Sequence, residues 1–429
     1  MPTPARRIAL SILSEVAAGG SLLSDLLAGQ EPEALDPRER RFLHELVLGT
    51  LRVRGVLDHA LAGVVDRPLS EVDPRVLGVL RLGAEQILRL RVPHRAAVHE
   101  SVELTRAFSK KAAPFVNAVL RRLAREGARP LPDPASDPLG WLESGGSLPR
   151  WLAERWLLRL GPDAAIARAR AFLEAPAPVF RFPSQSRDAA SRAKAEGVSW
   201  KERTVPGALL ATSGAIAELA RAGVVSIQDE GSQLIAHLAA TQGRILDACA
   251  APGGKALLMA ELVGRSGFVV AAEPSKVRLQ TLKALTARSG ATNIACLGAD
   301  LLSPPYATQF QSVLVDAPCS GLGTLGRHPD IRWRLHEADI ARHAARQREL
   351  LRSASRLVAP GGSLVYATCS LESEENEEVV SSFLKEAKGF APGGLPPWAS
   401  SFAFGEFLRT KPEAGQGDGF FAAKLVRVG

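Results

Sequence analysis

The sequence is poor in cysteine, and the spacing of its cysteines excludes two common uses of that residue. Only four occur among 429 residues, at positions 249, 296, 319 and 369. No two of them form the C-x-x-C pair typical of zinc sites, and their number and spacing indicate no disulfide framework. The sequence therefore predicts neither a metal site nor a disulfide-linked scaffold.

Long hydrophobic runs are also missing. Although 46% of the residues are hydrophobic, no uninterrupted apolar run approaches the length that spans a bilayer. Near the N-terminus, basic residues precede an apolar stretch, but Ser11, Ser14 and Glu15 interrupt it at helical spacing. This pattern indicates an amphipathic helix rather than a signal peptide. We therefore expect a cytoplasmic protein without membrane contact, long enough for two or three domains.

Acidic residues are outnumbered by basic ones. The chain has 53 Lys and Arg against 45 Asp and Glu, a formal net charge of +8. This excess favours a polyanionic partner such as RNA. Arginines cluster at positions 38, 40 and 41, at 121, 122 and 125, and at 327, 332 and 334. A single cluster of this kind is more often a solvated helix face than a binding site.

The most informative stretch that is present reads ILDACAAPGGK, from Ile245 to Lys255. A short apolar run ends at Asp247, and small residues form a loop before a helix that begins near Lys255. Such a loop lets a ligand approach the backbone closely, and the first N–H groups of the helix are unpaired donors. The glycines are adjacent and no Lys-Ser/Thr pair follows, so the dinucleotide-binding and P-loop patterns are excluded. A nucleoside without a pyrophosphate fits better, and S-adenosylmethionine is the obvious one.

Three later apolar runs also end in carboxylates. They are residues 268–272 before Glu273, 294–298 before Asp300, and 313–315 before Asp316. The helix-like intervals between them predict βα units and a parallel sheet, whose ligands bind beyond the carboxyl ends of the strands. Glu273 is well placed there to bind a ribose diol. A fifth strand over 362–366 leads to Cys369, so Cys319 and Cys369 should lie at the same edge.

Three segments together resemble the successive motifs of the RNA cytosine-5 methyltransferases. They are DACAAPGGK (247–255), VDAPCSGLGTLGRHPDIRW (315–333) and YATCSLESEENE (366–377). Within that family the chain is most similar to the RsmB (Fmu/Sun) type, which modifies 16S ribosomal RNA, over residues 225–429. The resemblance implies a Rossmann-like α/β catalytic domain that uses S-adenosylmethionine.

The resemblance also implies roles for individual residues in cofactor binding. The backbone and small side chains of the loop would hold the cofactor, with the ribose on Glu273, the adenine near Asp300, and Asp316 at the edge of the site. Two positions depart from the commoner pattern, because Glu273 stands where Asp is more frequent and Ala256 where Thr is. The loop residues concerned are Cys249, Ala250, Ala251, Pro252, Gly253, Gly254 and Lys255.

The expected chemistry is covalent catalysis. Carbon 5 of cytosine is a poor nucleophile, and addition of a thiolate to carbon 6 makes it enamine-like. Asp316 is the candidate acid at N3, and Lys255 would steady the charge or serve only as a helix-start or salt-bridge residue. The residues alone do not rank the two thiols. The resemblance assigns Cys369 as the nucleophile and Cys319 to product release.

The rest of the chain predicts a multidomain protein. Residues 1–126 read as helices, with helix starts at Asp36-Pro37 and Asp73-Pro74, and look similar to the NusB-like RNA-binding domain of this family. We expect a linker over 127–149, a helical and α+β RNA-binding extension over 150–225, and the methyltransferase domain over 226–429. The acidic stretch 372–378 should open a helix, and residues 419–428 should form a strand at the sheet edge.

The leading hypothesis is a monomeric, metal-free 16S rRNA cytosine-5 methyltransferase. One alternative is the same chemistry on transfer RNA or on another rRNA cytosine. A second alternative, from another class, is a non-catalytic RNA-binding assembly factor that keeps the fold. The intact cofactor loop, Asp316, Cys319 and Cys369 argue against the second.

Overall fold

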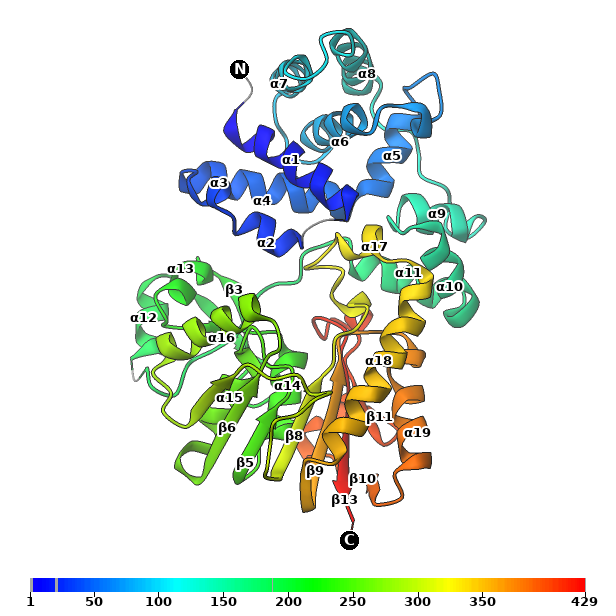
Figure 1. Cartoon of the computed structure of the whole chain (residues 1–429). Helices are drawn as coiled ribbons and strands as arrows, with labels where there is room; N and C mark the ends of the chain where they lie inside the picture. Colours follow the sequence, from blue (N-terminus) through cyan, green and yellow to red (C-terminus); the bar gives the residue numbers. More distant parts are fainter. Residues whose placement is uncertain (1–2, 20–21, 187, 429) are drawn as a thin grey trace. The chain divides into compact units, whose positions relative to one another are not determined.

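The computed structural model describes residues 3–19, 22–186 and 188–428 of the chain. Its contacts divide the chain into two compact units (Figure 1). The front unit comprises Met1–Ala175 together with Leu325–Leu335, and the sheet unit comprises Pro176–Thr324 together with His336–Gly429. The short segment 325–335 therefore belongs to the front unit, although the residues on either side of it belong to the sheet unit. The domain limits expected from the sequence stay predictions.

The front unit is helical throughout its described part. Two predicted helix starts are confirmed, because the Asp36 carboxylate accepts from the N–H groups of Arg38 and Glu39, and Asp73 caps the helix after it in the same way. Leucines such as Leu43 and Leu80 are fully buried in its core. The helices are α1 (Pro4–Ala18), α2 (Leu23–Leu27), α3 (Gln30–Glu33), α4 (Pro37–Arg52), α5 (Arg54–Ala62), α6 (Pro74–Leu88), α7 (His94–Arg106), α8 (Ala113–Glu126), α9 (Pro138–Ser144), α10 (Arg150–Leu160) and α11 (Pro162–Ala171).

Arg332 anchors the segment 325–335 within the front unit. It lies in the short helix α17 (Ile331–Arg334), and its side chain is fully buried. The guanidinium donates to four backbone carbonyls, those of Arg52, Ser147, Phe172 and Leu325, at 3.1–3.5 Å. Burial, and then the nearby charge of Arg52, lower its pKa to about 9. The arginine cluster at 327, 332 and 334 is therefore not simply a solvated face.

The sheet unit begins with a small antiparallel sheet of order β2-β3-β1-β4, joined by two short helices. Phe180 and Val198 are buried in its own core. The strand-like and helical pieces expected over 178–225 are present. They are β1 (Val179–Arg181), α12 (Ala189–Ala195), β2 (Ser199–Glu202), β3 (Leu209–Ser213), α13 (Ile216–Arg221) and β4 (Ser226–Ile227).

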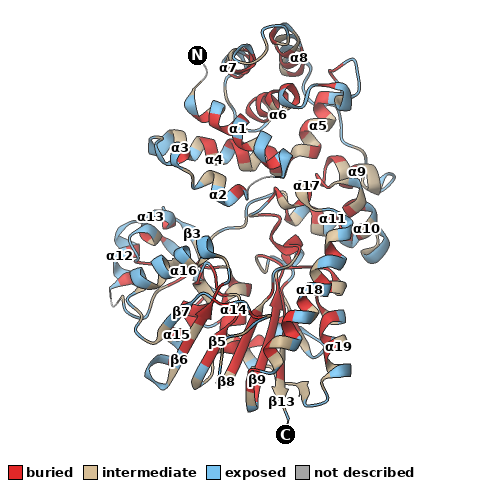
Figure 2. Cartoon of the chain, viewed as in Figure 1, coloured by how far each residue is buried: buried red, intermediate tan, exposed pale blue. Residues whose placement is uncertain are grey.

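The main sheet has the order β11-β12-β13-β9-β8-β5-β6-β7, and β9, β8, β5, β6 and β7 run parallel as predicted. Most residues of β5, β8, β9 and β13 are buried (Figure 2), whereas β7, β10 and β11 contain no buried residue. The strands are β5 (Gly243–Asp247), β6 (Gly267–Ala272), β7 (Ile294–Leu297), β8 (Phe310–Asp316), β9 (Val358–Thr368), β10 (Phe390–Pro392), β11 (Ala403–Phe404), β12 (Phe407–Arg409) and β13 (Phe421–Arg427).

Helices cover both faces of this sheet. Successive residues of each strand point to opposite faces, so neighbouring residues pack against different helices. Ile245 and Leu314 pack with α14, α15 and α16, whereas Leu246 and Val313 pack with α18 and α19. This explains why the strands read as continuous apolar runs instead of alternating ones. The helices are α14 (Glu230–Ala239), α15 (Gly254–Val263), α16 (Lys276–Ser289), α18 (Glu337–Ser355) and α19 (Glu377–Glu386).

One prediction about this sheet is wrong. The last strand, β13, does not lie at the edge, because it pairs with β9 on one side and with β10 and β12 on the other. Strands β10, β11 and β12 have only two or three residues each, too few to show a period in the sequence. None of the helices in the described part of the chain is long and apolar enough to cross a membrane.

We expect Arg332→Lys to destabilise the front unit strongly. A lysine keeps the buried charge but has no planar fork to reach four carbonyls, and each carbonyl left unsatisfied costs about 1–3 kcal/mol. The thermal unfolding midpoint should fall, and amide exchange over 325–335 should accelerate. Arg334→Lys is the matched control, since among the described residues Arg334 pairs only with Asp330, the cap of the same helix, at 2.9 Å. Equal midpoints for the two variants would contradict the anchoring role.

Candidate active site

The glycine-rich loop follows β5 and is tied to the neighbouring strands. The N–H of Ala248 donates to the Leu314 carbonyl and that of Ala250 to the Ala272 carbonyl, both at 2.9 Å. Gly253 has φ = 121°, and a Cβ there would lie 2.8 Å from the Leu282 side chain. Only glycine fits this position comfortably. The loop therefore stands at the carboxyl edge of the sheet, with α15 beginning at Gly254 as expected.

The two acids that follow β6 and β7 differ in their surroundings. Glu273 is buried, and its carboxylate accepts from the Ser275 N–H at 3.0 Å. Asp300 is exposed and accepts from the Leu302 N–H. Arg278, which the sequence did not single out, lies 3.5 Å from Glu273 and donates to the Ala251 carbonyl at 2.9 Å. It thereby links Glu273 to the loop.

Asp247, at the end of β5, is a buried carboxylate that lacks hydrogen-bond donors in the described part of the chain. Its side chain is 1% exposed, and neither of its oxygens has a hydrogen-bond partner among the described residues. Burial, followed by the negative charge of Asp316, raises its pKa to about 7. Burial and the nearby carboxylates also raise the pKa of the Cys249 thiol. Cys249 is thus a poor nucleophile, whereas Asp247 would gain from a cationic ligand.

The two thiols at the ends of β8 and β9 are neighbours. The strands pair in parallel with Asp316 opposite Ala367, and the sulfurs of Cys319 and Cys369 come within 3.3 Å. The hydrogen bond to Cys369 and then burial raise the pKa of Cys319 well above its ordinary value. Cys319 therefore keeps its proton at neutral pH and can offer an S–H donor to the Cys369 sulfur.

Lys255 and Asp316 form an ion pair beside the loop. The Lys255 ammonium, at the start of α15, donates to the Asp316 carboxylate at 2.8 Å. Burial alone would lower the pKa of Lys255, but the charge and hydrogen bond of Asp316 more than offset it and raise that pKa. The lysine thus stays protonated and holds a proton one hydrogen bond away from Asp316.

Glu375 joins the two cysteine loops, and the sequence did not predict this. Its fully buried carboxylate accepts from the Ser320 N–H at 2.8 Å and from the hydroxyls of Ser320 and Ser370, the residues after the two cysteines. Gln347 of α18 donates to it as well. The acidic stretch 372–378 was interpreted as a helix start stabilised by the helix dipole. For Glu375 this interpretation is wrong, since α19 begins only at Glu377.

The structure therefore brings the predicted catalytic side chains together at the same sheet edge as the glycine-rich loop. They are Lys255, Asp316, Cys319 and Cys369. No group of three or more His, Cys, Asp or Glu residues that could hold a metal ion occurs among the residues the structure describes.

Comparison with known proteins gives matches at both ends of the chain. Residues 236–426 match the family "16S rRNA methyltransferase RsmB/F", and residues 3–125 match the NusB family. A probable ribosomal RNA small subunit methyltransferase B of Bacillus subtilis is 35% identical, covering 100% of this chain and 99% of its own length. Ribosomal RNA small subunit methyltransferase B of Thermus thermophilus is also 35% identical, covering 99% and 98%. The crystal structure of PH0851 superposes with a TM-score of 0.78 at 25% identity, covering 99% of each chain.

We expect Glu375→Gln to disturb the cysteine pair without unfolding the protein. In the glutamine side chain an NH₂ donor replaces one of the two acceptor oxygens of Glu375. The remaining oxygen cannot accept from both serine hydroxyls and from the Ser320 N–H. Alkylation rates of Cys319 and Cys369, followed by mass spectrometry, should change severalfold. Glu378→Gln is the matched control, because Glu378 is exposed and accepts only from Ser373. Unchanged rates in Glu375→Gln would show that the carboxylate does not position the thiols.

A second prediction concerns Asp247. The pKa of the Asp247 carboxyl is near 7 in the folded protein and about 3.9 in an unfolded chain. The contribution of protonated Asp247 to the stability of the fold is therefore fully present below about pH 3.9 and is lost as the pH rises through 7. Asp247→Asn should therefore gain stability relative to the wild type as the pH rises from about 4 to 8, by about 4 kcal/mol in all. Thermal unfolding of the ligand-free protein measures the difference. The exposed Asp300→Asn should show no such trend, and a flat difference for Asp247→Asn would refute the raised pKa.

Proposed function

Given that this chain belongs to the 16S rRNA methyltransferase RsmB/F family, we propose that it methylates carbon 5 of a cytosine in 16S ribosomal RNA, using S-adenosylmethionine. The observation that carries this proposal is the pair of thiols 3.3 Å apart, beside the ion pair of Lys255 and Asp316. A cytosine ring needs a nucleophile at carbon 6 and a proton at N3 before carbon 5 can react, and this arrangement offers both.

The residues at the loop fit S-adenosylmethionine. Gly254 leaves room at the backbone, since a Cβ there would meet nothing closer than the Gln228 side chain at 3.7 Å. The unpaired oxygens of buried Asp247 suit a cationic ligand, and this ligand carries positive charge on its sulfonium and ammonium groups. When bound, it supplies an electrophilic methyl group. The residues proposed to hold it are those of the loop from Cys249 to Lys255, with Glu273, Asp300 and Asp316.

Cys369 acts first, by adding its thiolate to carbon 6 of the cytosine. Lys255 passes a proton to the Asp316 carboxylate across their 2.8 Å hydrogen bond, and Asp316 delivers it to N3, where it neutralises the displaced electron pair. Carbon 5 then has the electron density of an enamine and can accept the methyl group.

Cys319 acts at the end of the reaction. Once carbon 5 is methylated, its remaining proton must leave and the bond from carbon 6 to sulfur must break. Because the two sulfurs lie 3.3 Å apart, Cys319 can give its proton to the departing Cys369 sulfur as it takes the proton from carbon 5. The N3 proton returns through Asp316 to Lys255. The one proton released by the reaction is then on Cys369, which must lose it to solvent to become a thiolate again.

The two cysteines are distinguished by a trapping experiment with 16S rRNA and S-adenosylmethionine. Cys369→Ala should form neither adduct nor methylated RNA, although it should still bind S-adenosylmethionine. Cys319→Ala should attack and then stall, so that an RNA–protein adduct resistant to denaturing gels accumulates, and the double variant should lose it.

The opposite pattern, an adduct in Cys369→Ala that needs Cys319, would reverse the assignment. Normal turnover by both single variants would remove the covalent mechanism. Absence of methyl transfer by the wild type to any RNA would favour a non-catalytic assembly factor instead.

A further inference from the structure

The positive charge of the NusB-matching part of the chain is concentrated on one helical hairpin. Residues 91–126, which include α7 and α8, contain eight Lys and Arg against three Asp and Glu. Residues 1–90, which contain the other helices of that part, have eleven Lys and Arg against twelve Asp and Glu. The hairpin therefore accounts for the basic character of this region.

A groove of about 1440 Å³ runs along α7, the connecting turn and α8, and we call it the α7–α8 groove. No acidic residue lines it. Of the three acids of the hairpin, Glu100 accepts from the Thr3 N–H and lies near Arg6, whereas Glu103 pairs with Arg106 and Glu126 with Arg122 and Arg125, so two of the groove cations have a partner. The cations and histidines that line the groove are all exposed: His94, Arg95, His99, Arg106, Lys110, Arg121 and Arg125.

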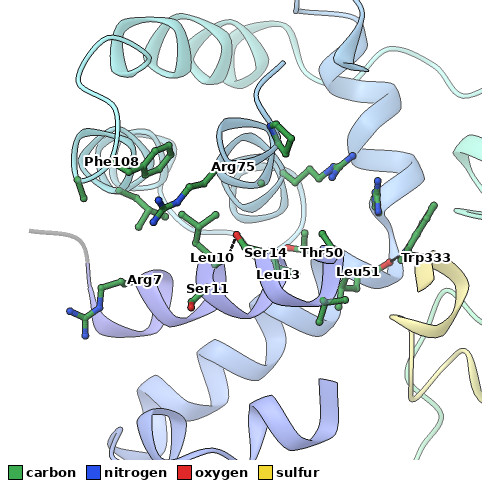
Figure 3. A pocket seen from close by; sticks show the side chains of 18 of the residues that line it. Arg7, Leu10, Ser11, Leu13, Ser14, Thr50, Leu51, Arg75, Phe108 and Trp333 are labelled. Atoms are coloured by element: carbon green, nitrogen blue, oxygen red, sulfur yellow. Dashed lines mark hydrogen bonds between the residues drawn. The ribbon is translucent and has the colours of Figure 1, made fainter. Parts of the chain in front are cut away.

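A second hollow of the front unit, of about 900 Å³, contains arginines that have partners within the chain (Figure 3). There Arg81 makes two hydrogen bonds to Asp58, at 2.7 and 2.8 Å. Arg75 stacks on the Phe108 ring (Figure 3). In the α7–α8 groove, by contrast, Arg95, Lys110 and Arg121 make no ion pair, side-chain hydrogen bond or ring contact with any residue the structure describes. Their charge is left for a partner outside the chain.

We propose that the α7–α8 groove binds the sugar-phosphate backbone of the RNA substrate. This rests on the proposed function, which makes RNA the substrate. Side chains that neutralise phosphates carry affinity and orientation rather than sequence recognition. The lining has no Phe, Tyr or Trp, and His94 and His99 supply its aromatic rings, so the groove fits the backbone of an RNA better than its exposed bases.

A membrane surface is the less suitable polyanion. Helices that lie in a bilayer interface present large apolar side chains beside their basic ones. No large hydrophobic side chain between residues 93 and 125 is strongly exposed. The groove therefore has the charge that would attract a membrane but lacks the side chains that would insert into it.

Equilibrium binding of the full-length protein to a labelled 16S rRNA transcript, at several salt concentrations, tests the proposal. Arg95→Gln/Arg121→Gln should weaken binding on the order of tenfold near 0.1 M salt. It should also make the slope of log K against log salt shallower by about 1.4 to 1.8, as expected for two lost phosphate contacts. The matched control is Arg38→Gln/Arg41→Gln, which removes two exposed arginines of α4 outside the groove and should bind like the wild type.

Three results would overturn the proposal: an unchanged slope in the groove variant, equal weakening in both variants, or lost binding to phosphatidylserine vesicles with RNA binding intact. Methyl transfer is measured separately on the same samples. A wild type that binds RNA with the predicted groove dependence but transfers no methyl group would refute the proposed function and leave the groove assignment standing.

Discussion

The parallel pairing of β8 with β9 is the constraint on which the site depends. With Asp316 opposite Ala367, the loops that leave these strands start side by side, and the Cys319 and Cys369 sulfurs meet at 3.3 Å. Glu375 then fixes both loops through the serines that follow the cysteines. A shift of either strand by one residue would turn the buried side chains of that strand to the opposite face of the sheet. The same hydrophobic burial that stabilises the sheet therefore positions the two thiols.

The segment 325–335 connects the second resembling motif, residues 315–333, to the front unit. It follows the Cys319 loop directly, yet its buried Arg332 donates to carbonyls of Arg52, Ser147 and Phe172 in that unit. Removal of residues 1–126 would take away one of these carbonyls and the Leu51 carbonyl that accepts from Trp333. The front unit thus has a structural role besides any contact with RNA, and point substitutions in the α7–α8 groove separate the two.

Much of the fold could be predicted from the sequence, because continuous apolar runs ending in Asp247, Glu273 and Asp316 leave few alternatives to a parallel sheet. The helix caps Asp36 and Asp73 were equally readable, since capping is a local interaction. Glu375 and Arg332 could not be chosen in this way. Each has several residues of the same charge beside it in the sequence. Its role depends on partners that are distant from it in the sequence. The position of β13 also depended on short strands that carry no periodic signal.

The central claim is methyl transfer to carbon 5 of a cytosine in 16S rRNA. Incubation of the wild-type protein with S-adenosylmethionine and a mixture of 16S, 23S and transfer RNAs, followed by bisulfite sequencing, tests it most directly. We predict one cytosine of 16S rRNA that becomes resistant to conversion, and none in the other RNAs. Resistance confined to transfer RNA or 23S rRNA, or methyl transfer without any resistant cytosine, would contradict the account.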